Sequence, residues 1–126
     1  MRNYEDLEVW QKAHALLLDI MPLTRGYPED ERFGLAAQTR SAGRGIPGAI
    51  VEGSGRRTDR DMARFLDISA GSASELEYWL RVAVDLGYIH RVTHDPLRAR
   101  VQEIRRMLYS LADYLRHSGP KTDDQD

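Results

Sequence analysis

The sequence contains no cysteine, and its 18 basic residues include only two lysines, Lys12 and Lys121. Without cysteine, neither a disulfide framework nor a thiolate metal site can form. No apolar run approaches the roughly 18 residues that a membrane span needs. The first ten residues also carry acids where a secretory signal needs an apolar stretch. We therefore expect a soluble, cytoplasmic protein that does not associate with membranes.

Length and composition favour one folded domain over residues 1–119. A chain of 126 residues with 41% hydrophobic content can bury a real core. Domains of this size bury a smaller share of their surface than large ones and often gain stability by association. Residues 120–126 are polar and include three aspartates, so we expect a disordered acidic tail there.

Apolar residues recur at three- and four-residue steps in four segments, which is typical of amphipathic helices. The expected helices span about residues 6–23, 29–52, 58–86 and 93–115. Thr58 and Asp61 resemble an N-terminal capping pair for the third helix, while Thr93, Asp95 and Pro96 are typical of the start of the fourth. No segment shows strand-like alternation. The predicted fold is all-α, an antiparallel up-and-down four-helix bundle.

The second of these helices has a composition that opposes helix formation. Gly34, Gly43, Gly45 and Gly48 each cost about 1 kcal/mol relative to alanine in a helix interior. Pro47 lacks the backbone N–H that would bond to the preceding turn. Helix propensity alone therefore predicts a break near residue 44.

The sequence offers no recognisable catalytic constellation. There is no cysteine nucleophile, and no serine lies in a nucleophile-elbow pattern. The Glu-x-x-His motif of di-metal helical bundles is absent too, because the residues three before the four histidines are Gln11, Gly87, Arg91 and Tyr114. We therefore expect no enzymatic activity, no metal and no cofactor.

Two further patterns match functional motifs only in isolation. Residues 43–48 read Gly-Arg-Gly-Ile-Pro-Gly, but a dinucleotide-binding turn needs a strand before these glycines, and a helix is expected here. His90 and His94 follow Gly87 in a predicted connection. Two histidines make a weak metal site, so we interpret them as solvated loop residues.

Positive charge is concentrated in residues 40–64, which hold six arginines and three acidic residues. Guanidinium groups bind phosphate oxygens in pairs, so an arginine cluster at one end of a bundle is suited to holding a phosphate backbone. Alternatively, Glu52, Asp59 and Asp61 neutralise some of these arginines and solvent surrounds the rest. The candidate nucleic-acid-binding residues are Arg40, Arg44, Arg56, Arg57, Arg60 and Arg64.

The unusual residues of the second helix also belong to a wider resemblance over about residues 4–90. The matching residues are Asp6-Leu7-Glu8-Val9-Trp10, Tyr27-Pro28, Glu31-Arg32-Phe33-Gly34-Leu35, Gln38, Arg40, Ile46-Pro47, Ile50-Val51-Glu52-Gly53, Phe65-Leu66, Ala70-Gly71-Ser72, Glu75-Leu76 and Leu86-Gly87-Tyr88. With these residues the chain resembles the four-helix bundle proteins encoded in intervening sequences of bacterial 23S ribosomal RNA.

This resemblance implies that the second helix continues through Pro47 with a kink and that the protein forms a homopentamer. The family is related to the accessory variability determinant protein of diversity-generating retroelements, a pentameric barrel that binds nucleic acid and a reverse transcriptase. The resemblance thus implies a nucleic-acid role for the arginine cluster and a reverse-transcriptase-like protein partner. It makes Gly43, Gly45 and Gly48 candidates for close helix or subunit packing.

Two hypotheses from different classes follow. The first is a non-enzymatic oligomer that holds the phosphate backbone of RNA or DNA with its arginines, and whose binding falls steeply with salt. The second is a self-assembling protein–protein scaffold that does not bind nucleic acid.

Overall fold

The structure is a computed structural model that describes residues 2–117. Its elements are the 3₁₀ turns η1 (Tyr4–Asp6) and η2 (Glu29–Glu31) and the helices α1 (Glu8–Arg25), α2 (Leu35–Ser54), α3 (Asp59–Asp85) and α4 (Arg91–His117). None of the described helices combines the length and apolar character needed to cross a membrane. The acidic tail predicted at 120–126 lies outside the described residues.

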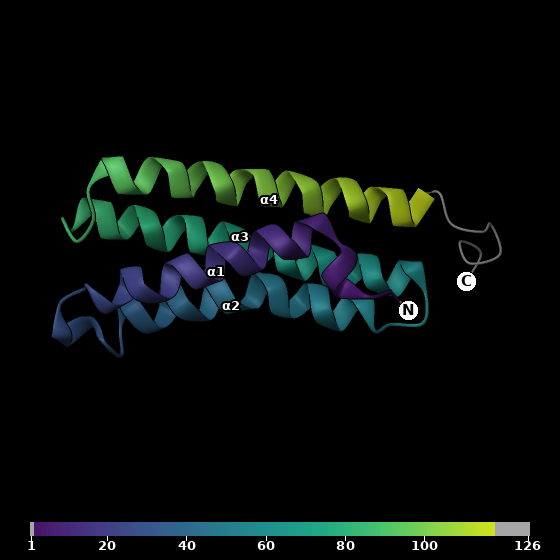
Figure 1. The fold of residues 1–126 in the computed structure, drawn as a ribbon, viewed down its shortest axis with the longest axis horizontal. Helices are drawn as coiled ribbons and strands as arrows, with labels where there is room; N and C mark the ends of the chain where they lie inside the picture. Colours follow the sequence, from purple (N-terminus) through teal and green to yellow (C-terminus); the bar gives the residue numbers. More distant parts are fainter. Residues whose placement is uncertain (1, 118–126) are drawn as a thin grey trace.

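The four helices lie side by side along the long axis of the molecule, and the connections between successive helices lie at alternate ends (Figure 1). Every helix contributes fully buried side chains to one continuous core, for example Ile20, Ile50, Leu76 and Leu108, each 0% exposed. The predicted all-helical, four-helix bundle is therefore confirmed.

Helix α2 is continuous through Pro47, so the break that propensity predicts near residue 44 is wrong. Ile46 and Ile50 are both 0% exposed. Burying two such side chains contributes about 3–6 kcal/mol, which offsets the roughly 3 kcal/mol cost of an internal proline. The buried Ser69 of α3 also donates a hydrogen bond of 2.7 Å from Oγ to the Ile46 carbonyl, next to the proline. Tertiary packing thus overrides propensity, and a kink at Pro47 stays a prediction.

The link between α2 and α3 follows the predicted capping chemistry. Gly55 ends α2, and its N–H donates to the carbonyl of Glu52 at 3.2 Å. Thr58 caps α3, since its Oγ1 accepts the backbone N–H of Asp61 at 3.0 Å. The next link contains Gly87 in a left-handed conformation, with φ of 79°, which glycine adopts at little cost.

Helix α4 begins at Arg91, two residues before its predicted start. The carbonyl of His90 accepts the backbone N–H groups of Thr93 at 3.0 Å and His94 at 2.9 Å, which closes the first turn earlier than the Thr93–Pro96 signals suggest. The interpretation of His94 as a solvated loop residue is therefore wrong: it lies in the first turn of α4 and is 5% exposed.

Glycines allow α2 and α3 to approach closely. A Cβ at Gly45 would lie 2.5 Å from Ser72 Oγ, and one at Gly53 would lie 2.9 Å from Phe65 Cβ and 3.3 Å from the Met62 carbonyl oxygen. Of the three glycines proposed for close packing, Gly45 therefore lies at a tight helix contact within the chain.

The other two glycines differ from Gly45. A Cβ at Gly43 would make ordinary contacts with Leu17 and Ile20 of α1, at 3.5 and 3.7 Å. A Cβ at Gly48 would have no described atom within 4 Å, so no close contact within the subunit requires a glycine there. A role for Gly48 in packing between subunits stays a prediction.

Candidate nucleic-acid interface

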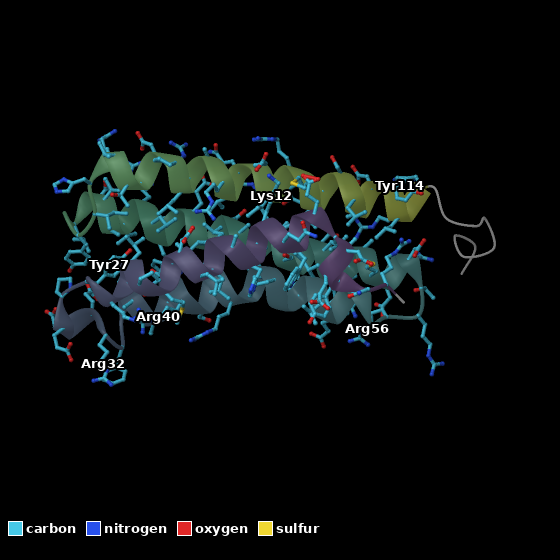
Figure 2. The ribbon with its side chains drawn as sticks, viewed as in Figure 1. Lys12, Tyr27, Arg32, Arg40, Arg56 and Tyr114 are labelled. Carbon is cyan, nitrogen blue, oxygen red and sulfur yellow. The ribbon has the colours of Figure 1, made fainter. Side chains whose placement is uncertain are left out.

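Four of the six predicted arginines lie together where α2 is joined to α3. We call Arg56, Arg57, Arg60 and Arg64 the turn arginines. Arg56 and Arg57 belong to the connection between Gly55 and Thr58, and the other two lie in the first two turns of α3. Figure 2 shows Arg56 at this end of the bundle. The connection borders a hollow of about 280 Å³ lined by Gly55, Arg56, Arg57, Thr58 and Asp61.

Two of the turn arginines are held against one aromatic ring. The guanidinium carbons of Arg56 and Arg64 each lie 4.5 Å from the centroid of the Phe65 ring. Phe65 itself is only 8% exposed. Cations over an aromatic face are attracted by its quadrupole, typically by about 0.5–1 kcal/mol at exposed sites. The two side chains are therefore oriented by the fold.

Acidic side chains neutralise part of the positive charge. Arg56 pairs with Glu52 at 3.5 Å and with Asp61 at 3.7 Å, and Arg64 pairs with Asp61 at 3.1 Å. Arg57 and Arg60 are exposed, and within residues 2–117 neither forms an ion pair. These two arginines are the ones most available to an external anion.

The N-terminal segment reaches the same end of the bundle. The backbone N–H of Arg2 donates to the carbonyl of Ser54 at 2.9 Å, and its guanidinium pairs with Asp59 at 3.1 Å. Arg2 thereby neutralises Asp59. All three acids of residues 40–64 are then paired with an arginine. No sequence pattern predicts this contact, because it joins residues far apart in the chain.

Arg40 and Arg44 do not belong to this cluster. Sixteen residues of helix and turn separate Arg40 from Arg56, which corresponds to about 24 Å at 1.5 Å per helical residue, and Figure 2 places the two at different ends of the bundle. Arg40 donates from Nε to Thr24 Oγ1 at 2.7 Å. With Arg25 and Arg32 it lines a separate hollow of about 170 Å³. Arg44 lies between the two ends on the exposed face of α2.

The structure shows the surroundings of the glycine-rich run and of the side chains that could bind a metal. The glycine-rich run at 43–48 lies in the middle of α2, and the part of the chain covered by the structure contains no strand that could precede it. Over the same residues, no three His, Asp or Glu side chains are grouped as a metal site would require. The run therefore has the surroundings of a packed helix rather than of a nucleotide-binding turn.

Three of the shifted pKa values belong to side chains far from the turn arginines. Glu31 accepts hydrogen bonds from the Leu35 N–H and the Tyr88 hydroxyl, and these lower the pKa of its carboxyl group. The same contact with Glu31 raises the pKa of Tyr88, while burial raises the pKa of Tyr27 to about 12. Tyr27 follows α1, Glu31 lies in η2 and Tyr88 follows α3, so none of these groups faces a turn arginine.

Comparison with known proteins identifies the family. The family described as 23S rRNA-intervening sequence protein matches residues 5–110. The chain belongs to this family. A solved structure from Bacteroides thetaiotaomicron VPI-5482, a protein of unknown function from the S23 ribosomal protein family, is similar to this intervening-sequence protein with 26% identity and a TM-score of 0.77. The similarity covers 82% of this chain and 97% of the other. No curated protein gives a significant match.

Proposed function

We propose that this intervening-sequence protein is a non-enzymatic, oligomeric helical bundle that holds the phosphate backbone of RNA or DNA with its turn arginines. The observation that carries the proposal is the exposure of Arg57 and Arg60 without an acidic partner among residues 2–117. Both lie beside Arg56 and Arg64, which the Phe65 ring holds in place. Guanidinium groups gathered at one end of a bundle are suited to backbone contacts, which position nucleic acid without reading its sequence.

The local charge balance sets the expected strength. Glu52, Asp59 and Asp61 lie among the turn arginines, so the surplus of positive charge is small compared with strongly basic nucleic-acid binders. We therefore expect binding that is weak at physiological salt, largely independent of sequence and strongly dependent on ionic strength. Association of several subunits would multiply the number of contacts along one strand.

A pair of matched double variants tests the interface. Arg57→Ala/Arg60→Ala removes two exposed arginines of the turn, and Arg25→Ala/Arg106→Ala removes two exposed arginines elsewhere. None of the four forms an ion pair within the described chain, so the net charge changes equally. Binding to a fluorescent structured RNA and to a DNA duplex is measured by anisotropy over a salt series.

We expect the turn variant to bind about tenfold more weakly at low salt, with a salt slope smaller by about 2, because two phosphate contacts are lost. The matched variant should change affinity by less than about twofold. Equal losses in both variants would show that binding follows net charge and not the turn. If the wild-type protein binds neither RNA nor DNA at low salt, the proposed nucleic-acid function is wrong.

The alternative function is a self-assembling protein–protein scaffold, and exposed apolar side chains favour it. Phe33 and Val92 are 83% and 86% exposed and so are available for contacts with another protein. A groove of about 720 Å³ also runs between α1 and α4, bordered by Leu7, Met107 and Leu111. A stable oligomer in light scattering, together with no nucleic-acid binding, would support the scaffold. The homopentamer and the reverse-transcriptase-like partner remain proposals, and the same mass measurement gives the subunit number.

A further inference from the structure

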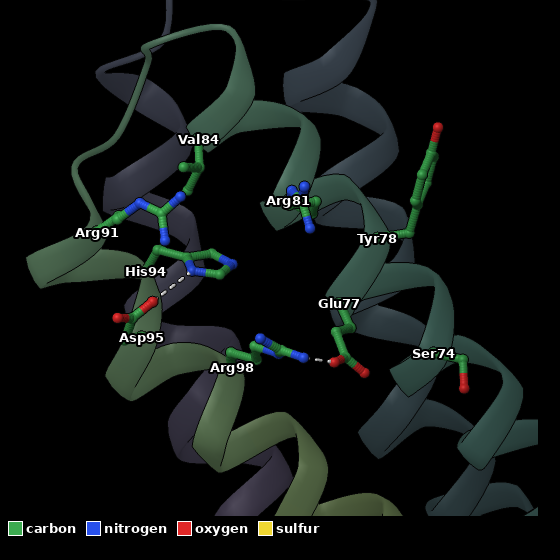
Figure 3. Close-up of a pocket in the computed structure, with 9 residues that line it drawn as sticks. All are labelled: Ser74, Glu77, Tyr78, Arg81, Val84, Arg91, His94, Asp95 and Arg98. Carbon is green, nitrogen blue, oxygen red and sulfur yellow. Dashed lines mark hydrogen bonds and ion pairs between the residues drawn. The ribbon is translucent and has the colours of Figure 1, made fainter.

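A further cavity lies at the other end of the bundle from the turn arginines, between the last turns of α3 and the first turns of α4. Its volume is about 350 Å³. Three arginines, Arg81, Arg91 and Arg98, line it together with His94 and Glu77 (Figure 3). Pockets of this size accommodate small ligands. Its lining comes from two packed helices and not from mobile loops, which favours a preformed site.

His94 is the unusual residue of this cavity. Its side chain is 7% exposed, and its Nδ1 lies 3.0 Å from Asp95 Oδ1. Because an ionised carboxylate only accepts hydrogen bonds, Nδ1 carries the proton of this contact. Nε2 is buried and has no hydrogen-bond partner within the described chain. Figure 3 shows the free edge of the ring directed into the space between α4 and α3.

A buried ring nitrogen without a partner limits the chemistry of a ligand. If the ring is neutral, Nε2 accepts a hydrogen bond and needs a ligand O–H or N–H. If the ring is an imidazolium, Nε2 donates and needs an oxyanion. A ligand that presents an acidic O–H satisfies both cases, because one proton is then shared between its oxygen and Nε2.

The three arginines of the cavity outnumber its two acids, Glu77 and Asp95. Arg98 pairs with Glu77 at 3.2 Å, and Arg81 pairs with Asp85 at 3.1 Å. Arg91 is exposed and forms no ion pair within residues 2–117. One guanidinium at the mouth of the cavity is therefore available for a charge-assisted, two-point bond to an oxyanion.

We infer that this cavity binds a phosphate monoester group, with Arg91 on two of its oxygens and His94 Nε2 sharing the proton of a third. A monoester has a second pKa near 6, so at neutral pH it still exchanges a proton. A phosphodiester has no such proton and cannot satisfy a neutral Nε2. The site is thus distinct from the backbone contacts of the turn arginines, and its existence does not depend on them.

Two sources can supply this group, a terminal phosphate of a nucleic-acid strand and a small phosphorylated molecule. The full-length protein is titrated at pH 7.5 with adenosine 5′-monophosphate, inorganic phosphate and sulfate. A short oligonucleotide with a 5′-phosphate and the same oligonucleotide with a 5′-hydroxyl are added as further probes. Affinity is measured by calorimetry, and the His94 ring nitrogens are followed by ¹⁵N NMR.

We expect phosphate and the monophosphate to bind about tenfold more tightly than sulfate, which is similar in size and charge but has no proton to share at this pH. The Nε2 resonance of His94 should shift during the titration. Arg91→Ala should weaken binding about tenfold, while Arg106→Ala, which removes another exposed α4 arginine outside the cavity, should leave it unchanged. Arg57→Ala/Arg60→Ala should also leave it unchanged, which separates this site from the proposed interface.

Preference for the 5′-phosphorylated oligonucleotide over the monophosphate would identify a strand end as the source, and the reverse preference a small molecule. His94→Phe should abolish the difference between phosphate and sulfate, and Arg91→Ala tests the site even if that variant does not fold. Equal binding of phosphate and sulfate, or no shift at His94 on saturation, would overturn the inference and leave the cavity filled by water alone.

Discussion

Where α3 meets α2, glycine and serine lie at the contact, whereas where α3 meets α4, long charged side chains reach across. Gly45 and Gly53 leave no room for a Cβ on the α2 side. On the α4 side, Glu77 of α3 accepts from Arg98 at 3.2 Å and Arg105 at 2.7 Å, and Asp67 pairs with Arg116. On the α4 side of α3, arginines form ion pairs across the contact between the two helices. On the α2 side, the turn arginines lie at the end of the helix pair and not between the helices.

This difference explains why a count of arginines does not show which are available. Arg98, Arg105 and Arg116 of α4 face acids of α3 and form ion pairs with them. Arg57 and Arg60 lie at the α2–α3 turn, are exposed and have no acidic partner within residues 2–117. The availability of a charge depends on what the neighbouring helix presents to it.

The largest expected effect comes from filling the α2–α3 contact. Gly53→Ala places a Cβ 2.9 Å from Phe65 Cβ and 3.3 Å from a backbone oxygen, and neither atom moves easily. We expect the free energy of unfolding to fall by about 1–3 kcal/mol. Gly48→Ala on the same helix meets open space and should raise stability by up to about 1 kcal/mol, because alanine is the better helix former. Urea unfolding measures the free energy of unfolding of both variants. If the two substitutions change it similarly, α2 and α3 do not pack this closely.

A smaller effect is expected on the α4 side. Glu77→Ala removes the acceptor shared by Arg98, Arg105 and Gln102, and we expect a loss of about 1–2 kcal/mol in urea unfolding. Glu75→Ala removes an exposed acid of the same helix that forms no ion pair among residues 2–117, so it should change stability by less than about 0.5 kcal/mol. Arg57→Ala/Arg60→Ala should change the free energy of unfolding by an equally small amount. A large loss in that variant would contradict the division between fold-stabilising and available arginines.

The smallest effect is a pH dependence at Glu77. Burial alone would raise the pKa of Glu77, but hydrogen bonds from Arg105, Gln102 and Arg98 outweigh burial and lower it below its ordinary value of 4.5. The folded state then binds fewer protons than the unfolded state, so this stabilisation is present above about pH 4.5 and is lost as pH falls through the lower folded-state pKa.

Glu77→Gln removes that contribution, which we expect to be below about 1 kcal/mol. Its stability deficit against the wild type should be constant from pH 7 to about 5 and shrink at lower pH. Urea unfolding between pH 3 and 7 measures this difference. A deficit that grows towards acid pH would contradict the sign of the pKa shift.

Local chemistry predicted much of the fold. The Thr58 cap, the stop at Gly55 and the left-handed Gly87 follow from residue types whose preferences act within a few residues. The continuity of α2 was not predictable from propensity, because burial of Ile46 and Ile50 against other helices decides it. The early start of α4 was missed because Thr93, Asp95 and Pro96 together resemble a helix start two residues too late.

The candidate site was predicted less well. The sequence placed the turn arginines in one candidate group, and they do lie together. It also included Arg40, which the rise of helix α2 separates from them. The cavity at His94 had no sequence signal of its own. Its residues come from two helices, and the burial of one histidine nitrogen is a property of their packing.

The anchoring of Arg2 on the carbonyl of Ser54 has a consequence for experimental design. Any affinity tag fused ahead of this residue emerges beside the α2–α3 turn. A polyhistidine tag there would add metal-binding side chains, partly cationic near neutral pH, next to Arg57 and Arg60 and would imitate or mask their contribution. Binding assays on this protein therefore require removal of such a tag, or its comparison with an untagged preparation.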